Sequence, residues 1–61
     1  MKNYTLLFEF PYYYLYSNHT NKLVMSGPLN DVFFGLKEFS EYHQISLSHL
    51  LNDISLKDKY K

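Results

Sequence analysis

The sequence predicts an α+β fold in which N-terminal strands or a hairpin precede two short helices, in the order β-β-β-α-α. Three observations predict it: apolar and polar residues alternate in the N-terminal half, Gly27-Pro28 interrupts the chain, and two apolar stripes with helical spacing follow. With 61 residues, the chain is expected to form a single domain, 1–61. Residues 1–26 are predicted to be strand-rich, residues 28–43 to form a first helix and residues 46–59 a second.

The first predicted strand has a period of two. Tyr4, Leu6 and Phe8 share one face, and the residues between them share the other. Pro11 cannot donate a hydrogen bond to a strand ladder, so it is expected to separate this strand from the next run, 12–16.

A polar cluster around His19 predicts a loop, followed by a third strand at residues 22–26. Alternation along that strand turns Leu23 and Met25 toward the core. The outward positions are then Lys22, Val24 and Ser26. The sequence permits this strand to pair with 12–16 inside one chain or with its copy across a dimer.

The first helix is predicted from an apolar stripe that advances in steps of three and four residues. Its members are Leu29, Val32, Phe33, Leu36 and Phe39. Lys37 and Glu38 fall on the opposite side. Pro28 suits a first helical turn, and Ser26 or Asn30 could cap it.

The second helix is predicted to begin at Ser46, whose hydroxyl can accept a hydrogen bond from an unpaired first-turn amide. The apolar residues that follow keep helical spacing: Leu47, Leu50, Leu51 and Ile54. Only about four residues, 42–45, separate the two helical patterns, which requires a sharp turn. The helices are therefore expected to cross or fold back.

Size and composition predict association. A chain this short buries only about 60% of its unfolded surface, and with no cysteine it has no disulfide to compensate. Hydrophobic residues make up 46% of the chain and aromatic residues 20%, more than one small core can hide. We therefore expect a homodimer or a protein partner.

Several classes of protein are disfavoured. Glu9 interrupts the N-terminal apolar run before it reaches signal-peptide length, and no run is long enough to span a bilayer, so we expect a cytoplasmic protein without a membrane partner. His19, His43 and His49 lack metal-ligand spacing, and no nucleophile has a base at a recognised distance. We expect no enzymatic activity, with no catalytic residue, metal, cofactor or small-molecule substrate.

The segment 22–59 resembles the ribbon-helix-helix family. The unit of that family is a short strand, a proline at the strand-to-helix junction, a helix, a tight turn, and a second helix begun by Ser or Thr. Here the matching features are the strand 22–26, Pro28, the helix from Leu29 to Tyr42, and Ser46 at the second helix start.

The resemblance implies a dimeric DNA-binding transcriptional regulator whose paired strands enter the major groove and whose second helix begins against a phosphate. The candidate DNA-contacting residues are Lys22, Val24 and Ser26 in the strand, Ser46 and Ser48 at the helix start, and Lys57 in a locally basic tail. Two departures stand against it. Gln44 occupies the position where the family usually has glycine, and the net charge is +0, whereas DNA-binding domains are usually basic.

The alternative is a protein-binding module, such as an inhibitor carried by a phage or mobile element, that does not bind DNA. Exposed tyrosines suit protein interfaces, and a strand at 12–16 would place alternate tyrosines on one face. The candidate interface residues are Tyr12, Tyr14 and Tyr16. An exposed sheet edge is a second surface that such a module could use.

Overall fold

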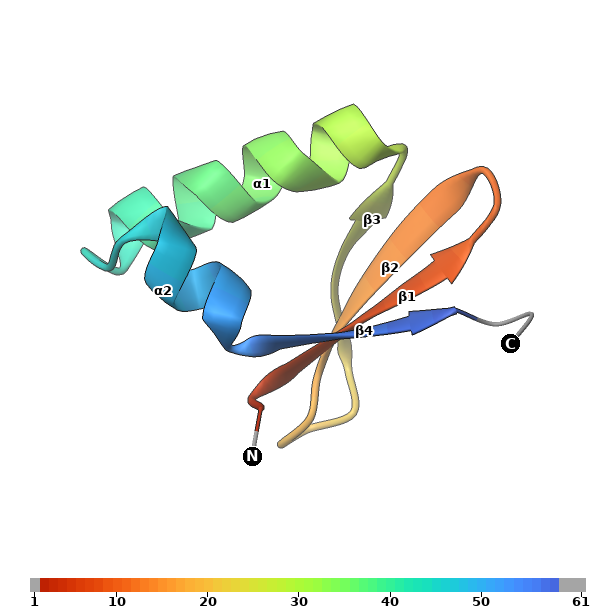
Figure 1. The fold of residues 1–61 in the computed structure, drawn as a ribbon, viewed down its shortest axis with the longest axis horizontal. Coiled ribbons are helices and arrows are strands. Elements are labelled where there is room, and N and C mark those ends of the chain that lie inside the picture. The colour runs from red at the N-terminus through yellow and green to blue at the C-terminus, as the bar shows by residue number, and fades with distance from the viewer. Residues whose placement is uncertain (1, 59–61) are drawn as a thin grey trace.

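The computed structural model describes residues 2–58, which form one four-stranded β-sheet and two α-helices (Figure 1). The elements in chain order are β1 (Tyr4–Glu9), β2 (Tyr12–Ser17), β3 (Leu23–Gly27), α1 (Leu29–Tyr42), α2 (Leu47–Asn52) and β4 (Ile54–Asp58). The predicted α+β class is confirmed, with three strands preceding the helices.

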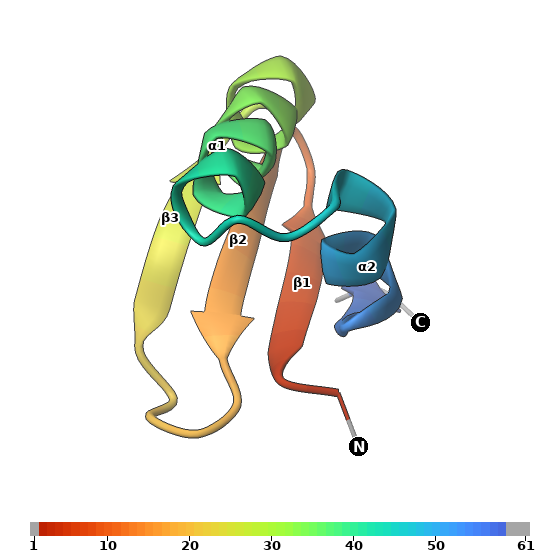
Figure 2. The same cartoon turned by 90° about the vertical axis from the view of Figure 1, so that its left-hand side faces the viewer.

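The strands lie in the order β3-β2-β1-β4, so β3 and β4 are the edges of the sheet. β1 pairs antiparallel with β2 and parallel with β4, and β2 pairs antiparallel with β3. The segment that contains α1 and α2 therefore carries the chain from one edge of the sheet to the other. Figures 1 and 2 show both helices on the same face of the sheet, so within residues 2–58 no helix covers the opposite face.

The first two strands form where the sequence predicts them, and they pair with each other as a hairpin. β1 and β2 are joined at Phe10-Pro11, whose peptide bond is cis. Leu6 lies opposite Leu15 across the pair, and both side chains are buried. The predicted alternation therefore directs one apolar row of each strand toward the helices.

β3 pairs with β2 inside the chain, one of the two arrangements that the sequence leaves open. The register shifts between Leu15 and Tyr16, so that Leu15 lies opposite Met25 but Tyr16 lies opposite Leu23. An extra residue in one strand reverses the alternation beyond it. The prediction that Leu23 enters the core is therefore wrong, and this side chain is 49% exposed.

Helix α1 begins directly after β3. Gly27 has φ 147°, a conformation that other residues rarely adopt, and a Cβ atom there would lie 3.3 Å from the Cβ of Asp31. Pro28 is the N-cap residue, and no side chain bonds the first turn. The predicted capping by Ser26 or Asn30 is therefore wrong.

The end of α1 is closed by a Schellman motif. The Ile45 N–H donates to the Ser40 carbonyl at 3.0 Å, and the Gln44 N–H donates to the Glu41 carbonyl at 3.2 Å. Gln44 has φ 57°, so it takes the left-handed conformation that glycine usually supplies. The turn expected between the helices thus closes at Gln44, without a glycine.

The second helix is shorter than predicted, and a fourth strand follows it. Ser46 caps α2 as predicted, since its hydroxyl accepts from the His49 N–H at 3.1 Å, but the helix ends at Asn52. The predicted helix 46–59 is wrong beyond that residue, and Lys59 lies outside the described residues. Residues 54–58 instead add a parallel strand to the edge of β1, with Leu56 opposite Leu6.

The core lies between the sheet and the two helices. Its buried apolar residues are Leu6, Leu15, Val32, Leu36, Leu50 and Ile54. Parts of the predicted helical stripes are not buried: Leu29 is 54% exposed, Phe33 50% and Leu51 44%. Helix α1 packs on β3, β2 and α2, so no strand or helix within residues 2–58 covers the flank that it turns toward β4.

Candidate functional site

Three tyrosines of β2 lie on the sheet face that no described helix covers. Tyr14 is directly opposite Leu7 on β1, and Tyr16 is opposite Leu23 on β3. Facing partners in a sheet project to the same side, and Leu15, which alternates with the two tyrosines, points into the core. We call the surface formed by Leu7, Tyr12, Tyr14, Tyr16 and Leu23 the tyrosine face.

The tyrosine face is rich in large apolar and aromatic side chains and open to contact. Tyr12 is 48% exposed, Leu23 is 49% exposed, and the remaining members are half-buried. The structure thus brings together the three residues predicted for a protein interface, and it adds Leu7 and Leu23, which sequence analysis did not assign to this surface.

The six candidate DNA-contacting residues do not form one surface. Val24 and Ser26 belong to edge strand β3, and Lys22 immediately precedes it. Lys57 lies on β4, and two strands separate β4 from β3. Ser26 and Lys57 project to the same face of the sheet, in one row with Tyr14 and Leu7, but these two residues of the intervening strands lie between them.

The remaining two DNA candidates lie at the start of α2, on the helix-covered side of the sheet. The Ser46 hydroxyl already accepts from the His49 amide, and its oxygen lies 3.4 Å from the Ser48 hydroxyl. This pair performs the capping that the sequence predicts. It is not adjacent to the outward residues of β3, because α2 contacts β4 and α1.

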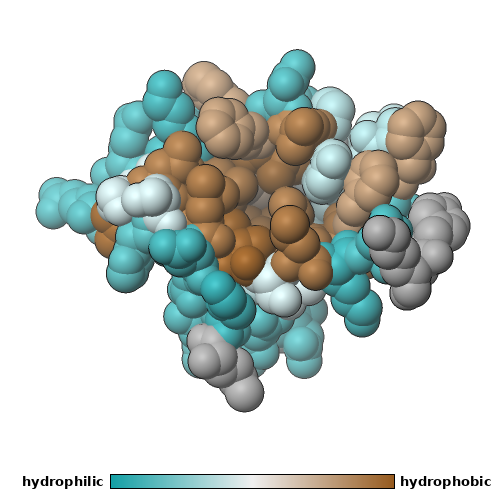
Figure 3. Space-filling view, in the orientation of Figure 1, coloured by the Kyte–Doolittle hydropathy of each residue, from teal (hydrophilic) through white to brown (hydrophobic). Residues whose placement is uncertain are grey.

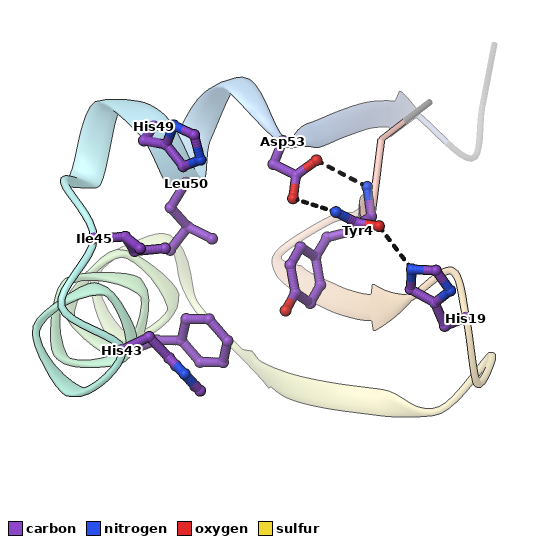
Figure 4. A pocket seen from close by; sticks show the side chains of 9 residues that line it. Tyr4, His19, His43, Ile45, His49, Leu50 and Asp53 are labelled. Carbon is purple, nitrogen blue, oxygen red and sulfur yellow. Dashed lines mark hydrogen bonds between the residues drawn. The ribbon is translucent and has the colours of Figure 1, made fainter.

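A cleft at the junction of α1, α2 and β1 contains all three histidines of the chain (Figure 4). The cavity has a volume of about 480 Å³, and its apolar wall includes Phe39, Ile45 and Leu50. The histidines come from the β2–β3 loop, the helix connection and α2. Their spacing in the sequence therefore does not predict the cleft. Only the position of His43 and His49 on either side of the turn gave a partial signal.

Asn3 links two sides of this cleft. Its backbone N–H donates to Asp53 Oδ1 at 3.0 Å, and its Nδ2 donates to Asp53 Oδ2 at 2.8 Å. The side-chain oxygen of Asn3 then accepts from His19 Nε2 at 2.7 Å, so His19 carries a proton on Nε2. The network ties the start of β1 to the β2–β3 loop and to the end of α2.

The same contacts perturb Asp53. Hydrogen bonds from the Asn3 side chain and backbone hold the pKa of the Asp53 carboxyl below its ordinary value of 3.8, and His49 and Lys2 lower it further. Lys2 also donates to the Asn52 carbonyl. Charge-assisted bonds of this kind favour the ionised carboxylate.

The cleft places imidazoles beside apolar side chains, a composition suited to holding a small polar group. His43 packs its ring 4.3 Å from the ring of Phe39, and Phe39 in turn meets Tyr4 edge-on at 5.9 Å. Among residues 2–58, no group of three or more His, Cys, Asp or Glu side chains has an arrangement that could hold a metal ion.

Comparison with protein-family models, with curated proteins and with solved structures finds no match to this chain. Neither of the two helices between residues 2 and 58 is long and apolar enough to cross a membrane.

Proposed function

We propose that this chain is a protein-binding module that contacts its partner through the tyrosine face. One observation carries the proposal: Tyr12, Tyr14 and Tyr16 lie side by side on a sheet face that no described helix covers. Tyrosine is enriched at protein interfaces because it combines a large apolar ring with a polar hydroxyl at low entropic cost. The proposal assigns no catalytic step to the chain.

Charge favours a protein partner over a nucleic acid. Rings on an open sheet can stack on bases, but surfaces that bind single strands combine such rings with a positively charged groove. On this side of the sheet Glu9 lies opposite Tyr12 and Lys57 lies opposite Leu7, one charge of each sign, and the chain as a whole has six Lys and Arg against six Asp and Glu. Counterion release by basic residues, which supplies most nonspecific affinity for nucleic acids, has little support here.

The in-chain pairing of β3 also weighs against the regulator that the family resemblance implies. In that arrangement the strand after the loop pairs with its copy from another chain, whereas here its neighbour is β2 of the same chain. The scattered positions of Lys22, Ser46 and Lys57 add to this. DNA binding is therefore the outcome that would contradict the proposal.

The proposal is tested with substitutions that keep strand propensity. Tyr14→Thr and Tyr16→Thr are expected to weaken binding of the protein captured from the producing cells by more than about tenfold each, as loss of aromatic anchors does. Tyr42→Thr is the matched control, because Tyr42 is 84% exposed at the end of α1, away from the tyrosine face. Binding is measured by titration of the purified pair.

Two results would contradict the protein-binding role. One is equal loss of binding in Tyr42→Thr and Tyr14→Thr. The other is binding to duplex DNA that falls steeply with salt and is weakened by Lys22→Ala and Lys57→Ala.

A further inference from the structure

A second apolar surface lies on a different side of the molecule, where the layer between helices and sheet is open. Figure 3 shows apolar side chains gathered across the region bounded by α1, α2 and β4, with the surface hollowed between them. We call it the β4-side face. From the exposed large apolar residues we assign five to it: Phe10, Leu29, Phe33, Leu51 and Leu56.

The topology explains why this side is open. Helix α1 packs on β3 and β2, and α2 contacts β4 only near the start of that strand, as Figure 1 shows. Leu56 lies opposite the buried Leu6, so it projects to the helix side of the sheet, yet it is 79% exposed. At the far end of β1, the exposed ring of Phe10 meets Phe8 edge-on at 6.4 Å. The core thus continues to the surface at the β4 edge.

The exposed flank of α1 belongs to the same surface. Leu29 and Phe33 are one helical turn apart and lie on the same side of the helix as the buried Leu36. Phe34 is also exposed, at 62%, but one step along the helix turns it about 100° further away from the core. Phe33 and Phe34 are therefore the same residue type on the same helix, but Phe34 points away from the β4-side face.

We propose that a second copy of this chain covers the β4-side face in an isologous homodimer. At roughly 200 Å² for a fully exposed large apolar residue, the five members expose about 600 Å² per chain. Two copies would bury about 1,200 Å², the lower end of the range for specific interfaces. None of the five members is charged, so two identical faces meet without opposing like charges.

The small size of the chain favours a second copy as the molecule that covers the β4-side face. Six buried apolar residues among residues 2–58 make a small core, and the chain contains no cysteine. Small domains of this kind gain stability by joining their cores across a two-fold axis. Here the joined surface would be the open end of the core itself, around Leu56, on a side distinct from the tyrosine face.

The proposal is tested by the mass of the chain in solution, measured by sedimentation equilibrium from about 1 to 100 µM. The wild-type chain is expected to reach twice the monomer mass. Leu56→Glu and Phe33→Glu are expected to weaken dimerisation at least about 30-fold, as a charge in the centre of an interface does. Phe34→Glu is the matched control and is expected to remain dimeric.

A wild-type chain that stays monomeric across this range would overturn the proposal. So would Leu56→Glu and Phe33→Glu variants that dimerise as tightly as Phe34→Glu does. Circular dichroism verifies that each variant is folded. If Leu56→Glu does not fold, the thermal midpoint of the wild type decides, because a dimer melts at higher temperature as its concentration rises and a monomer does not. Tyr14→Thr is expected to stay dimeric, which separates this proposal from the partner-binding role.

Discussion

At the scale of single residues, Gln44 occupies a left-handed backbone position that glycine would adopt with less strain. It closes the Schellman motif at φ 57°, where a side chain costs about 1 kcal/mol or more relative to glycine. The two apolar stripes confine the turn to residues 42–45, and the family resemblance implies Gln44 as its closing position, where glycine is usual. The strain follows from the absence of glycine there.

Gln44→Gly is therefore expected to raise the free energy of unfolding by about 0.5–1 kcal/mol, since relief of the left-handed strain exceeds the added entropy of the unfolded chain. Urea denaturation followed by circular dichroism measures the change. Gln44→Ala is the control, because alanine keeps the strain and should give no gain. A loss of stability in Gln44→Gly would show that the left-handed conformation is not a cost at this position.

Asp53 gives the fold a defined pH dependence. Its folded-state pKa is lowered by the Asn3 hydrogen bonds, so the unfolded chain binds a proton at this carboxyl more readily than the folded chain does. The stability that Asp53 contributes is therefore present above its ordinary value of 3.8 and is lost as the pH falls through that value toward the lower folded-state pKa.

Asp53→Asn is expected to be less stable than the wild type near neutral pH, with the difference shrinking as the pH falls to about 3. Denaturation at both pH values measures the free energy of unfolding of each chain. Asp31→Asn, at an exposed carboxyl in the first turn of α1, controls for a general effect of acid. A wild-type advantage that is the same at both pH values would contradict the role of the Asn3 contacts.

At the scale of elements, the strands β1 and β2 and the helix α1 follow from local pattern, whereas β4 does not. Leu47, Leu50, Leu51 and Ile54 have helical spacing, so the pattern continues through the end of α2 without a glycine or proline to stop it. What ends the helix is a distant partner, the free edge of β1, which accepts residues 54–58 as a parallel strand. Parallel pairing is non-local, and local periodicity does not report it.

Because Lys57 lies in a strand, we can predict whether a substitution there raises or lowers the free energy of unfolding. Lys57→Thr is expected to raise the free energy of unfolding by about 0.5 kcal/mol, because threonine favours strands and disfavours helices relative to lysine. Lys37→Thr, at an exposed position inside α1, is the control and is expected to lower it by about the same amount. Destabilisation by both substitutions in thermal melts would indicate a helix at Lys57.

At the scale of the whole molecule, the chain has two separate apolar surfaces around a small core. The tyrosine face was predictable in outline, because alternation in the run 12–16 places its tyrosines on one side whatever the strand pairs with. The sequence did not predict that this face is open, because its openness depends on both helices packing on the opposite face. The β4-side face was not predictable, because it depends on β4 and on where α1 crosses the sheet.

The pairing of β3 bears on the two functions that the sequence leaves open. Helix stripes and the Ser46 cap are compatible with a ribbon-helix-helix dimer, and nothing in residues 22–26 alone selects a partner strand. In the structure these residues complete a hairpin with β2, and a register shift turns Leu23 to the tyrosine face. These positions support the proposed protein-binding role, in which β2 and its neighbours form the contact surface.

Photo-cross-linking in the producing cells tests that central claim most directly. A benzophenone side chain replaces Tyr14 on the tyrosine face or, as the control, Glu38 on the exposed side of α1. The account predicts a protein adduct of one discrete mass from position 14 and none from position 38. Adducts with nucleic acid at position 14, or equal adducts at both positions, would contradict it.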